Sequence, residues 1–232
     1  MTEFLFAPPP VAALAIEGET TRFALRRIFC VGRNYAEHAR EMGAEPDRDA
    51  PFYFTKSTHH MQPSGITLPY PPGTALLHHE VELVVAIGAE AFRITPDQAA
   101  RAVFGYGVGL DMTRRDLQGA AKTQARPWDT GKDFDGSAVL APLTPATRFG
   151  APGTQRIWLE VNGTLRQQAR LSDMIHDVPA ILADLSRLYR LHPGDLIMTG
   201  TPAGVGPVGP GDVLHGGVDG LAPVALTLGP AE

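Results

Sequence analysis

The hydrophobic and polar positions change over short stretches of the chain, which predicts many strands and few helices. Buried strands are predicted at 28–32, where the run IFCVG is almost wholly apolar, and at 82–87, where the β-branched run ELVVAI favours extended backbone. Strands are also predicted at 103–111 and 196–199, and the pattern over 213–228 predicts two closing strands.

A β-hairpin is the clearest local prediction. Trp158 to Val161 and Leu165 to Gln168 flank the dipeptide Asn162-Gly163. Asn-Gly favours the type I′ turn, whose twist matches that of two antiparallel strands.

Helical spacing of apolar residues occurs in only a few segments. Helices are predicted at 35–42, at 95–103 with Thr95 as N-cap and Pro96 in the first position, and at 113–122 with Thr113 as cap. The strongest is 178–191, which places five apolar residues on one face: Ile181, Leu182, Leu185, Leu188 and Tyr189.

Composition supports this strand-rich pattern. The 232 residues include 25 Gly and 21 Pro, about a fifth of the chain, as short strands joined by tight turns require. Residues 1–25 form a short leading segment with an extended Pro8-Pro9-Pro10 run, and 45–50 is a polar surface loop. Neither a linker nor a repeat follows, so 26–232 is predicted to be a single α+β, strand-rich domain with a few short helices.

Charge and hydropathy exclude several classes of protein. A formal charge of −5 argues against a nucleic-acid binder, which needs a basic face. No stretch approaches the ~20 apolar residues of a membrane helix, and the N-terminus lacks a signal peptide's pattern. The single cysteine, Cys30, lies in a predicted strand and is interpreted as a buried structural thiol rather than a nucleophile. These features fit a cytoplasmic protein.

Three carboxylates at strand ends are candidate metal ligands. Glu80 and Glu82 alternate along one strand and so point to the same side, while Asp111 ends the next predicted strand. Oxygen ligands of this kind suit Mg²⁺ or Mn²⁺. The spacing alone fits equally well two solvated glutamates on an edge strand. The neighbouring His78 and His79 would face opposite ways, which argues against zinc.

His38 and Glu41 are three residues apart in a short predicted helix and therefore share a face. A carboxylate beside an imidazole raises its basicity, as deprotonation of water requires, although a surface pair has the same spacing. Lys132, among aromatic and glycine residues, either binds an anionic oxygen or lies on the surface. The glycine-rich loop 200–206 lacks the phosphate-loop patterns and does not support nucleotide binding.

Taken in order along the chain, these segments resemble the fumarylacetoacetate hydrolase superfamily, especially its acylpyruvate hydrolase branch. The resemblance covers about residues 27–221, and the matching pieces are CVGRNYAEHAREM, FYFTKSTHH, LHHEVELVVAIG, GYGVGLDMTRRDLQ, RPWDTGKDFDGS, WLEVNGTLRQ and PGDLIMTGTPAGVGPV.

The resemblance implies roles for individual residues. Glu80, Glu82 and Asp111 would bind Mg²⁺ or Mn²⁺, and His38 with Glu41 would activate water on a lid that orders with substrate. The residues implied to contact substrate oxygens are Arg115, Gln118, Lys132 and Thr201, with Lys56 near the same pocket. The implied fold is a mixed β-roll or β-sandwich with a few short helices, assembled as a homodimer.

The implied activity is metal-dependent hydrolysis of a C–C bond in a 2,4-dioxo acid. The wording of PYPPGTALLHHE and RPWDTGKDFD resembles bacterial fumarylpyruvate hydrolases of gentisate-type aromatic degradation, which release fumarate and pyruvate. The second carboxylate of that substrate needs a cation. Arg33, Arg114 and Arg126 are candidates, and each is equally well interpreted as ordinary surface charge.

Three other functions fit parts of the same pattern. One is oxaloacetate decarboxylation, which also produces a pyruvate enolate. Another is isomerisation or decarboxylation of homoprotocatechuate-pathway intermediates. A catalytically silent metal-binding scaffold belongs to a different class, and the presence of both His38 and Glu41 argues against it.

Overall fold

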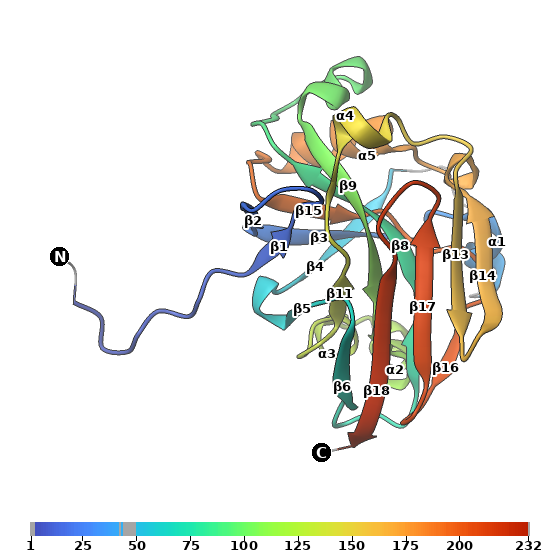
Figure 1. Cartoon of the computed structure of the whole chain (residues 1–232). Coiled ribbons are helices and arrows are strands. Elements are labelled where there is room, and N and C mark those ends of the chain that lie inside the picture. The colour runs from blue at the N-terminus through green and yellow to red at the C-terminus, as the bar shows by residue number, and fades with distance from the viewer. Residues whose placement is uncertain (1–2, 42, 44–49, 232) are drawn as a thin grey trace.

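Strands dominate the computed structural model, which describes residues 3–41, 43 and 50–231. They form one large sheet and three smaller ones, with the helices at the edges (Figure 1). The predicted strand-rich α+β class is therefore confirmed.

The large sheet contains eight strands and mixes parallel with antiparallel neighbours. Strands β3 and β15 are parallel, as are β5 and β11, and the other pairs are antiparallel. Its order across the sheet is β4 (Phe52–Lys56), β3 (Arg27–Gly32), β15 (Asp195–Met198), β8 (Val81–Ile87), β9 (Val103–Asp111), β11 (Ala138–Leu140) and β5 (Met61–Pro63), with β12 (Thr144–Pro145) also paired to β9.

Three smaller sheets complete the strands. The five-stranded sheet has the order β14 (Thr164–Arg170), β13 (Arg156–Val161), β17 (Val213–Val218), β18 (Val224–Ala231) and β6 (Ile66–Tyr70). The three-stranded sheet has the order β10 (Thr113–Arg114), β7 (Leu77–His79) and β16 (Gly206–Val208). The two-stranded sheet joins β1 (Ala13–Ala15) and β2 (Arg22–Ala24).

The described helices are short. They are α1 (Ala36–Glu41), α2 (Arg115–Thr123), α3 (Asp129–Lys132), α4 (Ala146–Phe149) and α5 (Val178–Leu188), with 3₁₀ turns η1 (Thr58–His60), η2 (Pro96–Arg101) and η3 (Leu171–Asp173). None of the helices in these described ranges is both long and apolar enough to cross a membrane.

The central strand β8 is buried on both faces, which explains why it is apolar at every position except Glu82 rather than alternating. All seven residues of β8 are buried. Leu83 and Val85 belong to the core cluster that includes residues of the five-stranded sheet and α5. Val84 and Ala86 belong to a second cluster with Cys30, whose thiol is fully buried as predicted.

Local signals correctly predicted the hairpin between β13 and β14. Asn162 and Gly163 both have positive φ, 53° and 73°, as a type I′ turn requires. Two of the predicted helices differ in part. Residues 96–101 start as predicted, with Thr95 as N-cap and Pro96 in the first turn, but they form a 3₁₀ helix. Thr113 lies in β10, where its hydroxyl donates to the Asp111 carbonyl instead of capping α2.

The helix α5 also ends earlier than its periodicity predicts. Tyr189 is already extended, with φ −134° and ψ 141°, because the chain turns there to pair Leu191 with Ala91. Leu188 is consequently 60% exposed, whereas Leu185 is fully buried.

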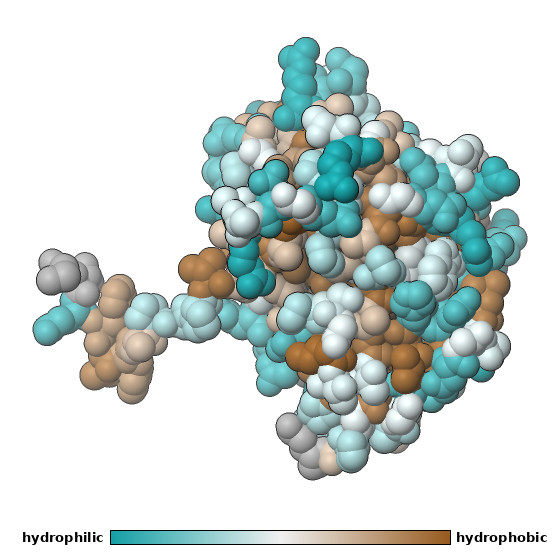
Figure 2. All heavy atoms as spheres, viewed as in Figure 1, coloured by the Kyte–Doolittle hydropathy of each residue, from teal (hydrophilic) through white to brown (hydrophobic). Residues whose placement is uncertain are grey.

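The leading segment has a folded part and an extended part. Leu14 of β1 is buried in the same cluster as Cys30. Phe4, Leu5 and Phe6 are exposed, and the extended part that contains them projects away from the body of the protein (Figures 1 and 2). The division into 1–25 and 26–232 stays a prediction, and the loop expected at 45–50 falls, except for Ala50, outside the described residues.

Leu185→Ala should lower the free energy of unfolding by about 2–5 kcal/mol, because it leaves a cavity in the core. Leu188→Ala is the matched control and should change it by less than about 0.5 kcal/mol. Urea denaturation measures both. Equal losses would show that Leu188 is packed in the folded protein.

Candidate active site

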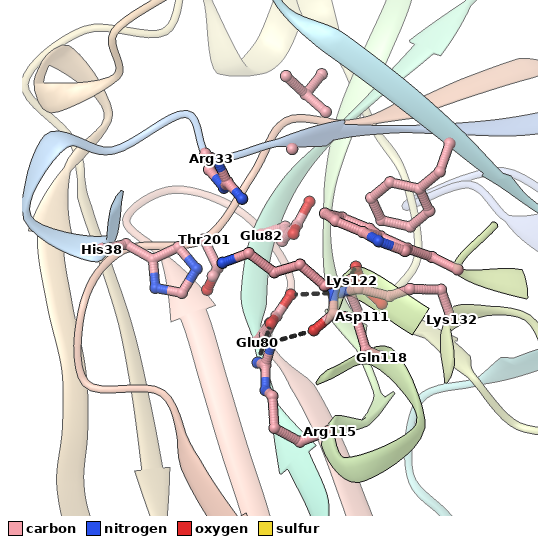
Figure 3. Close-up of a pocket in the computed structure, with 14 residues that line it drawn as sticks. Arg33, His38, Glu80, Glu82, Asp111, Arg115, Gln118, Lys122, Lys132 and Thr201 are labelled. Atoms are coloured by element: carbon pink, nitrogen blue, oxygen red, sulfur yellow. Dashed lines mark hydrogen bonds and ion pairs between the residues drawn. The ribbon is translucent and has the colours of Figure 1, made fainter. Parts of the chain in front are cut away.

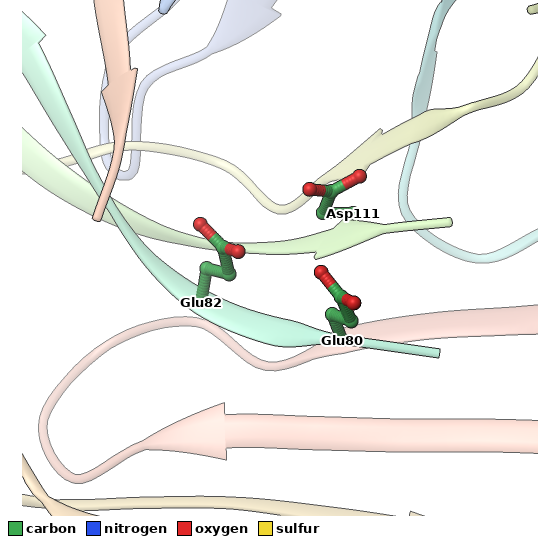
Figure 4. A group of neighbouring side chains, drawn as sticks. All are labelled: Glu80, Glu82 and Asp111. Atoms are coloured by element: carbon green, nitrogen blue, oxygen red, sulfur yellow. The ribbon is translucent and has the colours of Figure 1, made fainter. Parts of the chain in front are cut away.

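Three buried carboxylates lie together where β8 and β9 run side by side. Glu80 directly precedes β8, Glu82 lies within it, and Asp111 ends β9. The backbone N–H of Asp111 donates to the Glu80 carbonyl at 2.8 Å. Their side chains point to one side of the sheet (Figure 4), with ligand oxygens within 4.8 Å of one another. Glu80 and Glu82 are only 5% and 2% exposed, so the alternative of a solvated edge strand is wrong.

Lysine and arginine side chains compensate most of this buried charge. Lys132 Nζ lies 2.7 Å from both Glu80 Oε2 and Asp111 Oδ2, and Lys56 Nζ lies 2.8 Å from Asp111 Oδ1. Arg115 forms an ion pair with Glu80. Glu82 differs: in the described part of the chain it has no ion pair and accepts one hydrogen bond, from Gly200 N at 2.8 Å.

The pKa values of the two glutamates are therefore shifted in opposite directions. Burial raises the pKa of Glu82 well above its usual range, and the neighbouring Asp111 and Glu80 carboxylates raise it further. Burial would also raise the pKa of Glu80, but Lys132 and Arg115 outweigh it, and the net direction is down. A cation placed between these groups would hold Glu82 ionised. An all-carboxylate donor set of this kind could hold a hard divalent ion.

The helix α2 brings Arg115 and Gln118 to the same pocket (Figure 3). Arg115 Nη1 donates to Gln118 Oε1 at 2.5 Å, and its Nε donates to His78 Nδ1 at 3.3 Å. Burial and the Arg115 charge lower the pKa of His78 to about 4, so this imidazole stays neutral as an acceptor. His79 points elsewhere, to Gln167 at 3.0 Å, which agrees with the predicted divergence of the two histidines.

His38 and Glu41 form a pair at the edge of this pocket. His38 Nδ1 lies 3.2 Å from Glu41 Oε2, and both Glu41 oxygens accept from Gly204 N at 3.2 Å. His38 is 6% exposed and lines the pocket together with the carboxylates. His38 thus lines the pocket together with the carboxylates, whereas Glu41 is exposed and its carboxylate is held by the glycine-rich loop.

A buried glutamine that the sequence analysis missed fixes that loop. Gln167 Nε2 donates to Thr201 Oγ1 at 2.8 Å and to the Pro202 carbonyl at 2.7 Å, while its Oε1 accepts from Val81 N at 3.1 Å. Gln167 is fully buried, whereas Leu165 on the same strand is 45% exposed. Hydropathy predicts the opposite, so no sequence signal identified this residue.

Of the three candidate arginines, one lines the pocket and two do not. Arg33 lines the pocket, as does Lys122, which the sequence analysis also missed. Arg114 stacks on Phe134 at 4.2 Å from the ring centroid, and Arg126 is exposed. Neither Arg114 nor Arg126 lines the pocket.

Most of the chain matches one known protein family. Residues 27–228 match the model of the fumarylacetoacetate (FAA) hydrolase C-terminal family. A fumarylpyruvate hydrolase from Ralstonia is 49% identical over 197 residues, which cover 82% of this chain and all of that protein. An oxaloacetate tautomerase, YcgM, from Escherichia coli is 40% identical over 88% of this chain and 93% of its own length.

A solved structure shares the fold. The fumarylpyruvate hydrolase from Pseudomonas aeruginosa, in complex with Mn²⁺ and pyruvate, superimposes with a TM-score of 0.94 and 45% identity, covering 98% of this chain and all of that one. The fold expected from the resemblance is confirmed.

Without metal, the protein should lose stability as the pH rises above the pKa of an unfolded glutamate, about 4.3. A raised folded pKa of Glu82 means that its contribution is complete below the unfolded pKa, about 4.3, and is lost as pH rises through the folded pKa. Glu80 has a lowered pKa and titrates below this pH. Glu82→Gln should remove most of this dependence of the free energy of unfolding on pH, that is, most of the slope, because an amide does not titrate.

Urea denaturation in chelator at several pH values measures the slope. Glu90→Gln, at an exposed ion pair with Arg190, is the control and should keep it. A Glu82→Gln variant with the unmodified protein's slope would contradict the assignment to Glu82.

Proposed function

Because the chain belongs to the fumarylacetoacetate hydrolase family, we propose that it hydrolyses fumarylpyruvate to fumarate and pyruvate with a divalent ion. The observation that carries the proposal is a single pocket lined by the His38 imidazole and the carboxylates of Glu80, Glu82 and Asp111. The 49% identity to a fumarylpyruvate hydrolase, and a similar structure with Mn²⁺ and pyruvate, support this substrate.

Glu80, Glu82 and Asp111 are proposed to hold Mg²⁺ or Mn²⁺. Their donor set is entirely carboxylate oxygen, and Glu82 has no cation among the described partners. When bound, such an ion would supply Lewis acidity that stabilises negative charge on the oxo-acid end of the substrate.

His38 and Glu41 are proposed to activate the attacking water. Glu41 holds Nδ1 of the imidazole, which leaves Nε2 to take the proton of a water that attacks the carbonyl carbon at C4. The C3–C4 bond then breaks, the acyl carbon leaves as a carboxylate, and C3 recovers a proton to give pyruvate. Glu41 stabilises the imidazolium between the two transfers.

The remaining pocket residues are proposed to bind oxygen atoms of the substrate. Lys132 is fully ionised beside Glu80 and Asp111, and it stabilises the developing oxyanion together with Gln118. Arg115 is proposed to donate to the carboxylate of the oxo-acid end. Thr201 lines the same pocket, where its hydroxyl donates to the Val81 carbonyl at 2.8 Å. Lys56 is not among the residues that line the pocket, and its ammonium forms an ion pair with Asp111.

A second candidate activity comes from the oxaloacetate tautomerase at 40% identity. Tautomerisation or decarboxylation of oxaloacetate uses the same stabilisation of an enolate, but needs no attacking water. The silent scaffold is disfavoured because His38 lines the pocket and its imidazole is paired with Glu41. Assembly as a homodimer, cytoplasmic location and 26–232 as the catalytic domain stay predictions.

Purified protein with Mg²⁺ or Mn²⁺ should convert fumarylpyruvate to pyruvate faster than it converts acetylpyruvate or oxaloacetate. Coupled detection of pyruvate and direct detection of the enol form measure these reactions. Chelator should abolish turnover, since the bound ion would supply the Lewis acidity that stabilises negative charge on the oxo-acid end. Turnover of oxaloacetate but not of fumarylpyruvate would contradict the proposed hydrolysis and would favour the second candidate activity.

His38→Ala should lower kcat for fumarylpyruvate by roughly 10²-fold or more, because the water loses its base. The variant should still gain thermal stability from Mn²⁺, since its carboxylates are intact. Asp111→Asn should lose both turnover and the Mn²⁺-induced rise in Tm. His59→Ala, an exposed histidine, is the control. Unchanged kcat in His38→Ala would exclude the proposed base.

A further inference from the structure

Two cations at the rim of the pocket are not used by the proposed chemistry. Lys56, Lys132 and Arg115 are all paired with the buried carboxylates. Arg33 and Lys122 line the same pocket, and within residues 3–41, 43 and 50–231 neither has a carboxylate partner. Figure 3 shows Arg33 and Arg115 on opposite sides of the carboxylate cluster, with the Lys122 side chain reaching across it.

The local backbone and an aromatic wall hold Arg33 at this rim. Arg33 has φ 54°, a left-handed conformation that a residue other than glycine adopts at some energetic cost. Gly32 precedes it, and a Cβ there would lie only 2.0 Å from the Phe52 ring. Phe52 therefore packs against bare backbone, and the Arg33 guanidinium lies 5.7 Å from its ring centroid. Trp128 supports Phe52 edge-on at 5.5 Å.

Lys122 lies on the same helix as the residues at the other end of the pocket. Arg115, Gln118 and Lys122 of α2 are spaced by three and four residues, so they share one face. At a rise of 1.5 Å per residue, Arg115 and Lys122 are about 10 Å apart along the helix axis. Arg33 and Arg115 place positive charge on opposite sides of the carboxylate cluster, and Lys122 adds a third charge to the same pocket (Figure 3).

A dianionic acylpyruvate carries one negative charge at each end. In fumarylpyruvate, six carbon–carbon bonds of about 1.5 Å set the two carboxyl carbons about 7–8 Å apart when extended. With the oxo-acid end at the buried carboxylates and Arg115, the second carboxylate reaches the rim. The side chains of Phe54, Trp128 and Val31 line the wall of the same pocket and offer apolar contact for the carbon chain between.

We propose that Arg33, assisted by Lys122, binds the distal carboxylate and selects acylpyruvates whose acyl group ends in an acid. The inference rests on the proposed function and names its specificity-determining residue. Guanidinium binds carboxylate through paired, charge-assisted hydrogen bonds. Arg114, stacked on Phe134, and exposed Arg126 lie outside the pocket and have no part in this recognition.

The test compares kcat/KM for fumarylpyruvate with kcat/KM for acetylpyruvate, which lacks the distal acid, in the Mg²⁺-loaded protein. Arg33→Gln should lower the ratio of the two by about 10- to 100-fold, the range for losing a charge-assisted hydrogen bond. The loss should come mainly from KM for fumarylpyruvate. Arg126→Gln, which removes a charge outside the pocket, should keep the ratio.

The result that overturns the inference is a ratio in Arg33→Gln within two-fold of the unmodified protein's, including an equal fall for both substrates. Such a result, with both substrates hydrolysed by the unmodified protein, leaves the proposed function intact. If the unmodified protein hydrolyses neither substrate, the proposed function fails, and this inference falls with it.

Discussion

Burial of three carboxylates at the β8–β9 pair is the constraint on which the rest of the structure depends. Taking one such charge out of water costs several kcal/mol unless partners compensate it. The compensating groups come from three separate parts of the chain: Lys56 at the end of β4, Arg115 at the start of α2 and Lys132 in α3. Folding must bring these segments together before the cluster can close, which ties the position of the short helices to the charge balance.

The compensation is uneven, and this unevenness points to the chemistry. Lys132 is shared between Glu80 and Asp111, whereas Glu82 receives one backbone hydrogen bond and has a raised pKa. A divalent ion would satisfy Glu82 and would compete with Lys132 for the other two carboxylates. Lys132 is then available to an anionic oxygen of the substrate. The same lysine thus stabilises the ion-free protein and serves the proposed reaction.

Local sequence signals predicted those structural features that depend on residues close together in the chain. The Asn162-Gly163 turn and the buried run of β8 are examples, because turn geometry and apolar runs act over a few residues. Gln167 and Lys122 escaped prediction since their roles depend on contacts between distant segments. The assignment of Thr113 as a helix cap was wrong for the same reason: the hydroxyl accepts instead from Lys132, 19 residues later. The family resemblance, not spacing, brought the ten site residues together.

The metal assignment is tested by a crystal structure of the protein with Mn²⁺, through the anomalous difference map measured near the manganese edge. One strong peak is expected between Glu80, Glu82 and Asp111, with Lys132 Nζ moved away from the position that it shares between Glu80 and Asp111. A peak at another cluster, or a cluster without a peak and with Lys132 unmoved at saturating Mn²⁺, would contradict the assignment.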